Sequence, residues 1–306
     1  MRILVLGHTG YLGAHVAERL RALPTVRVLR AGRSPGAEVR IDLAADRPER
    51  LATTLAAAAP DAVVNCAGAT GGDPVTLAEV NARGPAALCA ALREAAPAAR
   101  LVHLGSAAEY GPGAFGVRVG EAAATRPITP YGATKLAGTV AVNTSGVDGV
   151  VLRVGNPVGP GAPAGGLPGR ITGLLRAAGP DPAAVLRLGD LSAYRDFVDV
   201  RDVARAVELA VTAPGPLPPV LNISSGDAVP VRDLVRGLAR RADFRGRIEE
   251  DASGAAGSLR SAQVSWQCSD VTAAATALGW RPALQLDDML ASLWEAADAR
   301  DGSHVA

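Results

Sequence analysis

The chain has 306 residues, of which 48% are hydrophobic and 20% are charged, a composition typical of a globular protein with one large or two modest domains. A formal net charge of +1 gives no electrostatic basis for binding nucleic acid or an anionic membrane, and no run of about 20 apolar residues spans a bilayer. Three scattered cysteines exclude a disulfide framework and a cysteine-based zinc site, so we expect a protein of the reducing cytoplasm with no metal.

A glycine-rich loop follows the first predicted strand. Residues 2–6 form a short apolar run, the segment Gly7-His-Thr-Gly-Tyr-Leu-Gly13 comes next, and residues 11–23 have helical periodicity. Strand, glycine loop and helix in this order predict a dinucleotide site whose phosphates lie on the helix N-terminus. The alternative is a glycine-rich turn without a ligand. The expected cofactor contacts in this loop are Gly7, Thr9, Gly10, Tyr11, Leu12 and Gly13.

The end of the second predicted strand, residues 26–31, indicates the type of cofactor. An acidic residue that would bind a free ribose 2′-hydroxyl is missing, and Arg30 and Arg33 lie in this region instead. Because a guanidinium group suits a 2′-phosphate, the sequence favours NADP(H) over NAD(H). The alternative is that both arginines are solvated loop residues.

Strands and helices continue to alternate through residue 104. We predict strands at 39–43, at 61–68 (running into a loop of small residues) and at 100–104, with helices at 48–59 and 76–95. This alternation predicts an α/β fold with a doubly wound parallel sheet and a site at the carboxyl ends of its strands. Further expected cofactor contacts are Asp42, Leu43, Cys66, Ala67, Gly68 and Asn81.

The segment Thr129-Pro-Tyr-Gly-Ala-Thr-Lys135 contains the one lysine of the sequence. Tyr131 and Lys135 are one helical turn apart, and a lysine beside a tyrosine lowers the pKa of the phenol. Arginine cannot replace it in this role, because guanidinium remains protonated. Ser106 follows the fifth strand, so its hydroxyl and the phenol of Tyr131 can converge on one carbonyl group. The alternative is a solvated lysine near an ordinary tyrosine.

A smaller second lobe is predicted after the sixth strand, residues 150–153. Residues 155–169 are almost all turn formers and indicate the crossing into that lobe, with a flexible linker as the alternative. We assign residues 1–156 and 196–224 to the dinucleotide-binding domain, residues 157–195 and 225–300 to a substrate-binding lobe, and residues 301–306 to a frayed tail. The later elements expected are helices at 170–178, 200–211, 231–241, 271–278 and 287–299, and strands at 185–188 and 220–223.

The ordered set of motifs resembles the extended short-chain dehydrogenase/reductase family, which contains nucleotide-sugar epimerases, dehydratases and ketoreductases. The resemblance extends from Arg2 to about Pro282. Its pieces are the glycine loop, Asn65-Cys-Ala-Gly68, Ser106 to Gly111, Tyr131-x-x-x-Lys135, Leu152-Arg-Val-Gly-Asn-Pro157, Arg195-Asp-Phe-Val198, Asn222 and Leu278-Gly-Trp-Arg-Pro282.

The resemblance implies roles for single residues. Tyr131 is similar to the family's catalytic acid, Lys135 to its partner on the nicotinamide ribose, and Ser106 to the group that orients the carbonyl. The implied substrate contacts are Ser106, Ala107, Tyr131, Asn156, Arg170, Arg195 and Arg260. It also implies a homodimer.

Three departures from the family patterns narrow the expected reaction. No acid follows the second strand, as it does in members that keep a tightly held NAD. The Asp-Glu pair of dehydratases is replaced by Ala107 and Ala108, and the cysteine and histidine of members that epimerise next to the carbonyl are missing. We therefore expect an NADPH-dependent reductase of a nucleotide-linked 4-keto-6-deoxy sugar. The alternatives are a nucleotide-sugar 4-epimerase, a catalytically silent NADP(H)-binding regulator and a reductase of a non-sugar ketone.

Overall fold

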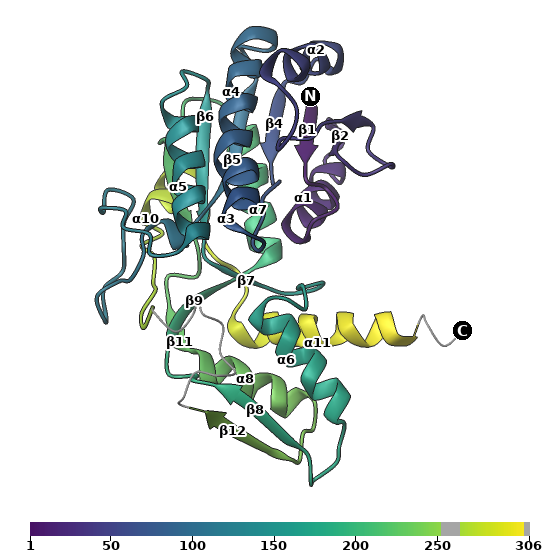
Figure 1. Ribbon diagram of the computed structural model, residues 1–306, viewed down its shortest axis with the longest axis vertical. Helices are drawn as coiled ribbons and strands as arrows, with labels where there is room; N and C mark the ends of the chain where they lie inside the picture. Colours follow the sequence, from purple (N-terminus) through teal and green to yellow (C-terminus); the bar gives the residue numbers. More distant parts are fainter. Residues whose placement is uncertain (252–263, 303–306) are drawn as a thin grey trace.

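A parallel sheet of seven strands forms the centre of the fold in the computed structural model, which describes residues 1–251 and 264–302 (Figure 1). The strand order is β10-β6-β5-β4-β1-β2-β3, so the order reverses between β1 and β4, where a doubly wound sheet binds its ligand. The strands are β1 (Arg2–Leu6), β2 (Arg27–Gly32), β3 (Val39–Arg40), β4 (Ala62–Asn65), β5 (Arg100–Ser106), β6 (Gly149–Val154) and β10 (Val220–Ile223). The doubly wound α/β fold predicted from the sequence is confirmed.

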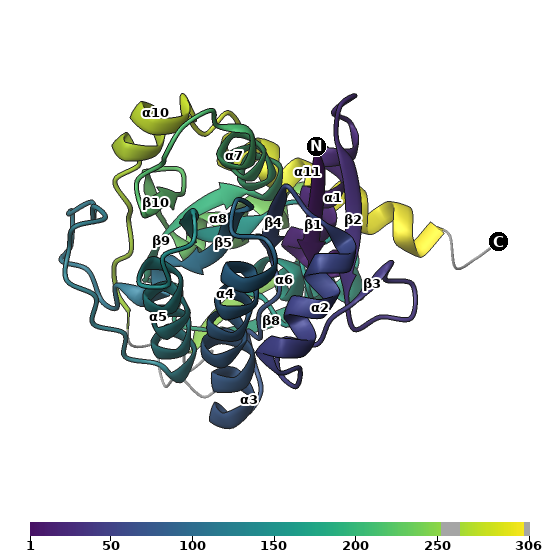
Figure 2. The same ribbon diagram turned by 90° about the horizontal axis from the view of Figure 1, so that it is seen from above.

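Helices cover both faces of this sheet (Figure 2). Along β1, Ile3 and Val5 belong to the core under one set of helices, and Leu4 and Leu6 to the core under the other. Because both faces are buried, the strands are continuously apolar instead of alternating. One face carries α1 (Tyr11–Arg21), α7 (Val200–Thr212) and α10 (Thr272–Leu278); the other carries α2 (Pro48–Ala58), α3 (Pro74–Ala78), a π-helical turn (Glu79–Arg83), α4 (Gly84–Ala95) and α5 (Pro130–Asn143).

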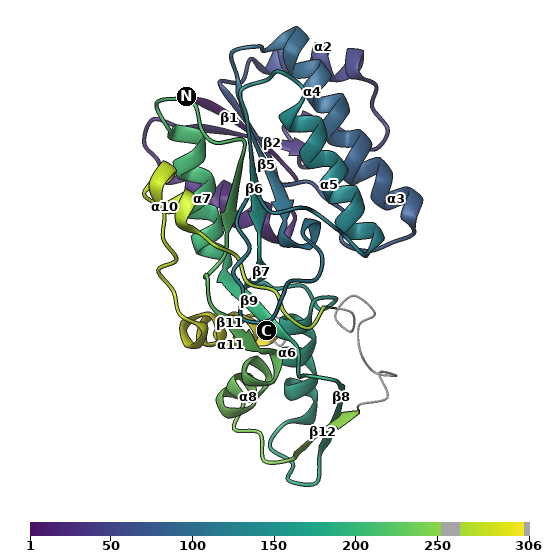
Figure 3. The same ribbon diagram turned by 90° about the vertical axis from the view of Figure 1, so that its left-hand side faces the viewer.

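A smaller lobe lies beyond the carboxyl ends of the sheet strands (Figure 3). Its own hydrophobic core includes Ile171, Leu234 and Leu290, one from each of its three helices. The elements of this lobe are α6 (Leu167–Ala178), α8 (Val231–Arg241), α11 (Leu286–Gly302), the two-stranded sheet of β8 (Val185–Gly189) and β12 (Arg247–Asp251), and the three-stranded sheet of β7 (Asn156–Val158), β9 (Tyr194–Asp199) and β11 (Ala228–Pro230). Within the described residues, no helix is long and apolar enough to cross a membrane.

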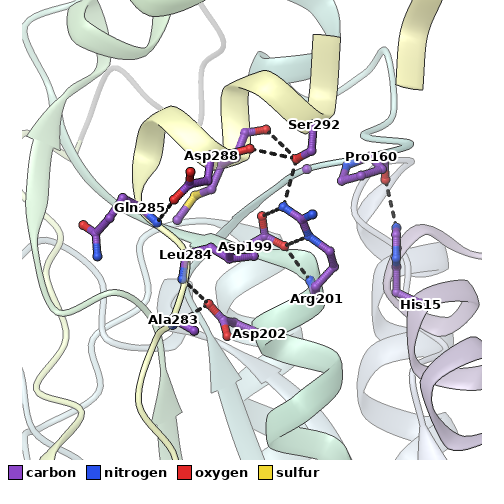
Figure 4. Close-up of polar contacts among 12 residues, drawn as sticks. His15, Pro160, Asp199, Arg201, Asp202, Ala283, Leu284, Gln285, Asp288 and Ser292 are labelled. Carbon is purple, nitrogen blue, oxygen red and sulfur yellow. Dashed lines mark hydrogen bonds and ion pairs between the residues drawn. The ribbon is translucent and has the colours of Figure 1, made fainter. Parts of the chain in front are cut away.

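Two aspartates at the start of α7 connect the sheet to the smaller lobe (Figure 4). Asp199 caps the helix and forms an ion pair with Arg201, whose guanidinium also donates a hydrogen bond of 3.0 Å to Ser292 Oγ of α11. Asp202 accepts hydrogen bonds of 2.8 and 3.0 Å from the N–H groups of Ala283 and Leu284. These contacts fix the segment before α11 against the first turn of α7.

The helix after the glycine loop also contacts the crossing into the smaller lobe. The hydroxyl of Tyr11 donates a hydrogen bond of 3.3 Å to the carbonyl oxygen of Gly159. Nε2 of His15 lies 2.9 Å from the carbonyl oxygen of Pro160 (Figure 4). Tyr11 was expected to touch the cofactor, and its phenol is held by the crossing segment. The start of α1 is therefore in direct contact with the segment that crosses into the smaller lobe.

The helix predicted at 76–95 is interrupted. The segment 79–83 is a π-helical turn between α3 and α4. Pro85 has no N–H to donate to the carbonyl of Asn81, so the regular bond pattern cannot continue there. The helix α5 packs closely against the carbonyl of Asn81, as a Cβ atom on Gly138 would overlap this oxygen.

Strand lengths also differ from the sequence prediction. The third strand, predicted at 39–43, has only two residues, because Asp42 N–H bonds to the Asp46 carboxylate and the chain turns away from β2. Three short strands were not predicted: β7, within the turn formers, and β11 and β12. Their pairing is with distant segments, so local pattern gave no signal for them.

Candidate active site

The glycine loop has the close packing that a dinucleotide-binding turn requires. Gly7 has a φ of +74°, and a Cβ atom there would lie 2.8 Å from the backbone nitrogen of Ala67, in the loop after β4. A Cβ atom on Gly13 would overlap the carbonyl oxygen of Gly7, so only glycine lets α1 begin this close to β1. Gly10 precedes the first turn of α1, and a Cβ atom there would meet only Gly7 O, at 3.3 Å. This backbone cradle fits a pyrophosphate at the helix N-terminus.

At the end of β2, the two arginines that were predicted to bind a 2′-phosphate differ in whether they have an acidic partner. Arg30 forms an ion pair of 2.9 Å with Glu38, so its charge is already matched. Hydrogen bonding from Arg30 lowers the pKa of the Glu38 carboxyl. Arg33 is exposed and has no side-chain partner among the described residues, and the buried Oγ of the adjacent Ser34 likewise has none there. Arg33 and Ser34 thus form the part of this turn with unused charge and hydrogen-bonding capacity.

The loop after β4 is held from beneath by two asparagines. Asn65 accepts a hydrogen bond of 3.1 Å from the Ala67 N–H, and Asn81 bonds to both backbone polar groups of Ala69 at 2.9 and 2.8 Å. Asn81 was predicted as a cofactor contact, and the structure uses its amide to fix the loop. Gly68 faces α5, since a Cβ atom there would lie 3.9 Å from Lys135 Nζ.

The predicted contacts Asp42 and Leu43 follow β3. Asp42 accepts a hydrogen bond of 3.0 Å from the Ala44 N–H, and Leu43 is buried under Gly84. Arg83 donates to the carbonyl oxygens of Leu43 and Ala44 at 3.2 and 3.1 Å, which ties this turn to α4.

Ser106, Tyr131 and Lys135 come from adjacent elements. Ser106 ends β5, and its Oγ accepts a hydrogen bond of 3.2 Å from the Ala108 N–H, so the hydroxyl is fixed at the start of a 3-10 turn (Ala107–Glu109). Tyr131 lies in the first turn of α5, which Thr129 caps. The next residue, Gly132, contacts that same turn, because a Cβ atom there would lie 2.6 Å from Ala108 O. Close packing of α5 on this turn brings the predicted trio to one end of the sheet.

Lys135 is buried, with 5% of its surface exposed. Its ammonium donates a hydrogen bond of 2.5 Å to Leu104 O. Burial lowers the pKa of Lys135 to about 8, and the Glu109 charge opposes this shift. The lowered pKa fits the dissociable ammonium that the arginine-rich composition indicates.

The expected substrate side is formed by β7, β9 and the segment after residue 263. Asn156 donates from Nδ2 to Asp196 O at 3.0 Å and to Gln267 Oε1 at 2.9 Å. Arg195 is 6% exposed, donates to Tyr194 O at 2.7 Å, and its pKa is lowered by burial. Gln267 was missed, since a lone glutamine 111 residues from Asn156 gives no sequence signal.

Two further arginines were expected to contact the substrate. Arg170 lies half-buried in the first turns of α6, and Arg260 lies outside the described residues. Within the described residues, no group of three or more His, Cys, Asp or Glu side chains is arranged to hold a metal ion.

Comparison with known proteins gives the family of this arrangement. Residues 3–224 match the model of the "NAD dependent epimerase/dehydratase family". The chain belongs to this family. It is 37% identical to the dTDP-6-deoxy-L-talose 4-dehydrogenase (NAD(P)(+)) of Kitasatospora kifunensis, over 96% of this chain and 95% of that protein.

Solved structures of similar proteins contain nicotinamide cofactors. MoeE5 in complex with UDP-glucuronic acid and NAD has a TM-score of 0.83 and 26% identity, covering 98% of this chain and all of the other. RMD from Pseudomonas aeruginosa complexed with NADPH has a TM-score of 0.82 and 25% identity, covering 98% of this chain and 99% of the other. The predicted resemblance to extended short-chain dehydrogenases/reductases is confirmed, and the chain is an NAD(P)-dependent enzyme of this oxidoreductase and epimerase group.

Proposed function

We propose that this enzyme is an NADPH-dependent ketoreductase of a nucleotide-linked 4-keto-6-deoxy sugar. The observation that carries the proposal is the close packing of α5, which carries Tyr131 and the buried Lys135, on the turn that follows Ser106 at the carboxyl end of β5. The names of the similar dTDP-sugar dehydrogenase and of the P. aeruginosa RMD with NADPH support a nucleotide-sugar substrate and a nicotinamide cofactor.

Three residues of the chain have different roles in the proposed reduction. When bound, the nicotinamide supplies the hydride to the carbonyl carbon. The Ser106 hydroxyl donates a hydrogen bond to the carbonyl oxygen, and Tyr131 gives that oxygen its phenolic proton. The Lys135 ammonium stabilises the phenolate that remains. Burial of Lys135 makes this stabilisation strong, because the local dielectric constant is low.

The preference for NADPH depends on Arg33 more than on Arg30. The Arg30 charge is matched by Glu38, whereas Arg33 is exposed and can reach a 2′-phosphate. Glu38 also brings a carboxylate to the end of β2, which the sequence spacing did not reveal. A carboxylate suits a free ribose 2′-hydroxyl. We therefore expect NADPH to be preferred and NADH to be accepted.

Asn156, Arg195 and Gln267 form the proposed contacts to the sugar nucleotide. Both Nδ2 hydrogens of Asn156 are engaged, by Asp196 O and Gln267 Oε1, so Asn156 presents only its carbonyl oxygen to a sugar hydroxyl. Arg195 supplies the positive charge for a diphosphate.

A second candidate, nucleotide-sugar 4-epimerase, is favoured by the fold shared with the NAD-bound epimerase structures. The two functions differ in where the hydride remains. Purified protein is incubated with dTDP- and GDP-linked 4-keto-6-deoxyhexoses, with and without NADPH, and NADPH absorbance and sugar products are measured. We expect one NADPH consumed per sugar reduced and no reaction without NADPH. Interconversion of two sugar nucleotides without added cofactor would establish the epimerase instead.

A further inference from the structure

A buried ion pair lies directly behind Ser106. Glu109 is fully buried, Arg153 of β6 is 4% exposed, and Arg153 Nε lies 2.7 Å from Glu109 Oε2. Replacing such a pair with apolar residues often leaves stability unchanged or higher, so the pair is poorly explained by stability alone. The Arg153 guanidinium also lies 4.5 Å from the centre of the Tyr110 ring.

Both carboxylate oxygens of Glu109 are used for positioning. Oε1 accepts the Ser106 N–H at 2.8 Å, which fixes the backbone of the serine. Oε2 accepts the hydroxyl of Thr139 at 2.9 Å as well as the guanidinium of Arg153. A single carboxylate therefore connects the end of β5, the strand β6 and the catalytic helix α5.

The same carboxylate is bound by the face of α5 that carries Lys135. Thr139 is four residues after Lys135, so both side chains lie on one face of α5. Lys135 donates to Leu104 O, two residues before Ser106, while Thr139 donates to Glu109. A Cβ atom on Gly105 would lie 2.7 Å from Glu109 Oε1, so nothing bulky separates the strand from the carboxylate.

The other titratable groups that face Lys135 are neutral near pH 7. Burial raises the pKa of the Cys66 thiol to about 12. Burial, together with the Lys135 charge, holds the pKa of His103 well below its usual range. Asn65 Nδ2 lies 3.1 Å from His103 Nδ1. Among the described residues, Glu109 is thus the anion that compensates the buried ammonium, and it is shared with Arg153.

We propose that Glu109 is a positioning residue that fixes Ser106 through its backbone N–H and serves as the counter-ion that keeps Lys135 protonated. Its catalytic importance rests on the proposed reductase function, but its effect on Lys135 does not. Two cations share one carboxylate, so the cluster keeps one excess positive charge. That excess stabilises the phenolate of Tyr131 when its proton has been transferred.

The single lysine makes the test direct. Protein without a lysine-containing tag, labelled with ¹³Cε-lysine, gives one lysine resonance, and its chemical shift against pH reports the protonation of Lys135 in the absence of cofactor and substrate. We expect a wild-type midpoint near pH 8, as the structure gives. A wild-type midpoint below about pH 7 would overturn the proposal without any variant, because the ammonium would then not be maintained at neutral pH.

The variants separate charge from packing. Glu109→Gln should lower the midpoint of Lys135 by about half a pH unit or more, because the compensating charge is lost while the shape is kept. The matched control Thr139→Val removes a hydrogen bond to Glu109 but keeps its charge, and should leave the midpoint unchanged. If Glu109→Gln does not fold, Arg153→Met removes the competing cation, leaves the Glu109 charge to Lys135 alone and should raise the midpoint. An unchanged midpoint in whichever of these two variants folds would contradict the proposal.

Kinetics then test the catalytic consequence. With a dTDP-linked 4-keto-6-deoxyhexose, the alkaline limb of kcat should move to lower pH in Glu109→Gln, while the Kd for NADPH changes less than about twofold. A uniform loss of kcat at every pH would indicate a purely structural role. If the lysine titration behaves as expected but no sugar is reduced, the proposed reaction fails and the role of Glu109 as counter-ion stands.

Discussion

Lys135 should destabilise the protein at neutral pH, and its removal should therefore be stabilising. The native pKa of Lys135 is about 8, compared with 10.5 for an exposed lysine. The unfolded chain thus binds this proton more tightly, and the stability contribution of the group improves as pH rises from about 8 to 10.5. At 1.36 kcal/mol per pH unit, the penalty is about 3 kcal/mol at pH 7 and falls to about 1 kcal/mol at pH 10.

The test compares wild type with Lys135→Met by urea denaturation at both pH values. The variant removes the ammonium and keeps most of the apolar length of the side chain. Its stability relative to wild type should be about 2 kcal/mol more favourable at pH 7 than at pH 10. Using the difference between the two pH values cancels the contributions of titrating groups that do not interact with Lys135, because both proteins share them.

Lys135→Arg is the matched control for this measurement. Guanidinium remains protonated over the whole range, so the burial penalty should be the same at pH 7 and pH 10 and activity should be lost. A Lys135→Met difference that does not change with pH would refute the reasoning, since it would mean that the lysine titrates normally. An active Lys135→Arg variant would show that a tunable ammonium is not required.

The remaining predictions concern catalysis and binding. Arg33→Ala should weaken NADPH binding by about 10-fold or more and leave NADH binding unchanged, whereas Arg30→Ala should have a smaller effect; equal losses in calorimetric titrations would contradict the assignment of the 2′-phosphate to Arg33. Tyr131→Phe should lower kcat by about 10²–10⁴-fold with little change in NADPH affinity, measured by stopped-flow reduction, and a near-normal rate would exclude it as the proton donor. Arg195→Ala should weaken binding of dTDP but not of NADPH, and Lys at this position should restore only part of it; a loss of both ligands would instead indicate a structural role.

The sequence determined the features that depend on local geometry. Gly7 and Gly13 occupy positions where a Cβ atom would collide with the backbone, so the glycine spacing could be interpreted without a structure. The continuous apolar strands follow from burial on both faces, which is why the doubly wound sheet was predicted correctly. The solitary Lys135 indicated chemistry because composition had replaced every generic cation with arginine, and it proved to be buried with a lowered pKa.

The tertiary structure decided which charged and polar groups are paired. Arg30 and Arg33 look equivalent in the sequence, but the loop between β2 and β3 brings Glu38 into an ion pair with Arg30 and not with Arg33. The Gln267 partner of Asn156 comes from a segment with no sequence pattern of its own. Glu109 and Arg153 are 44 residues apart in the chain, and they meet only because β5 and β6 lie side by side. Pairings of this kind depend on long-range packing and desolvation, which hydrophobic periodicity and motif spacing do not encode.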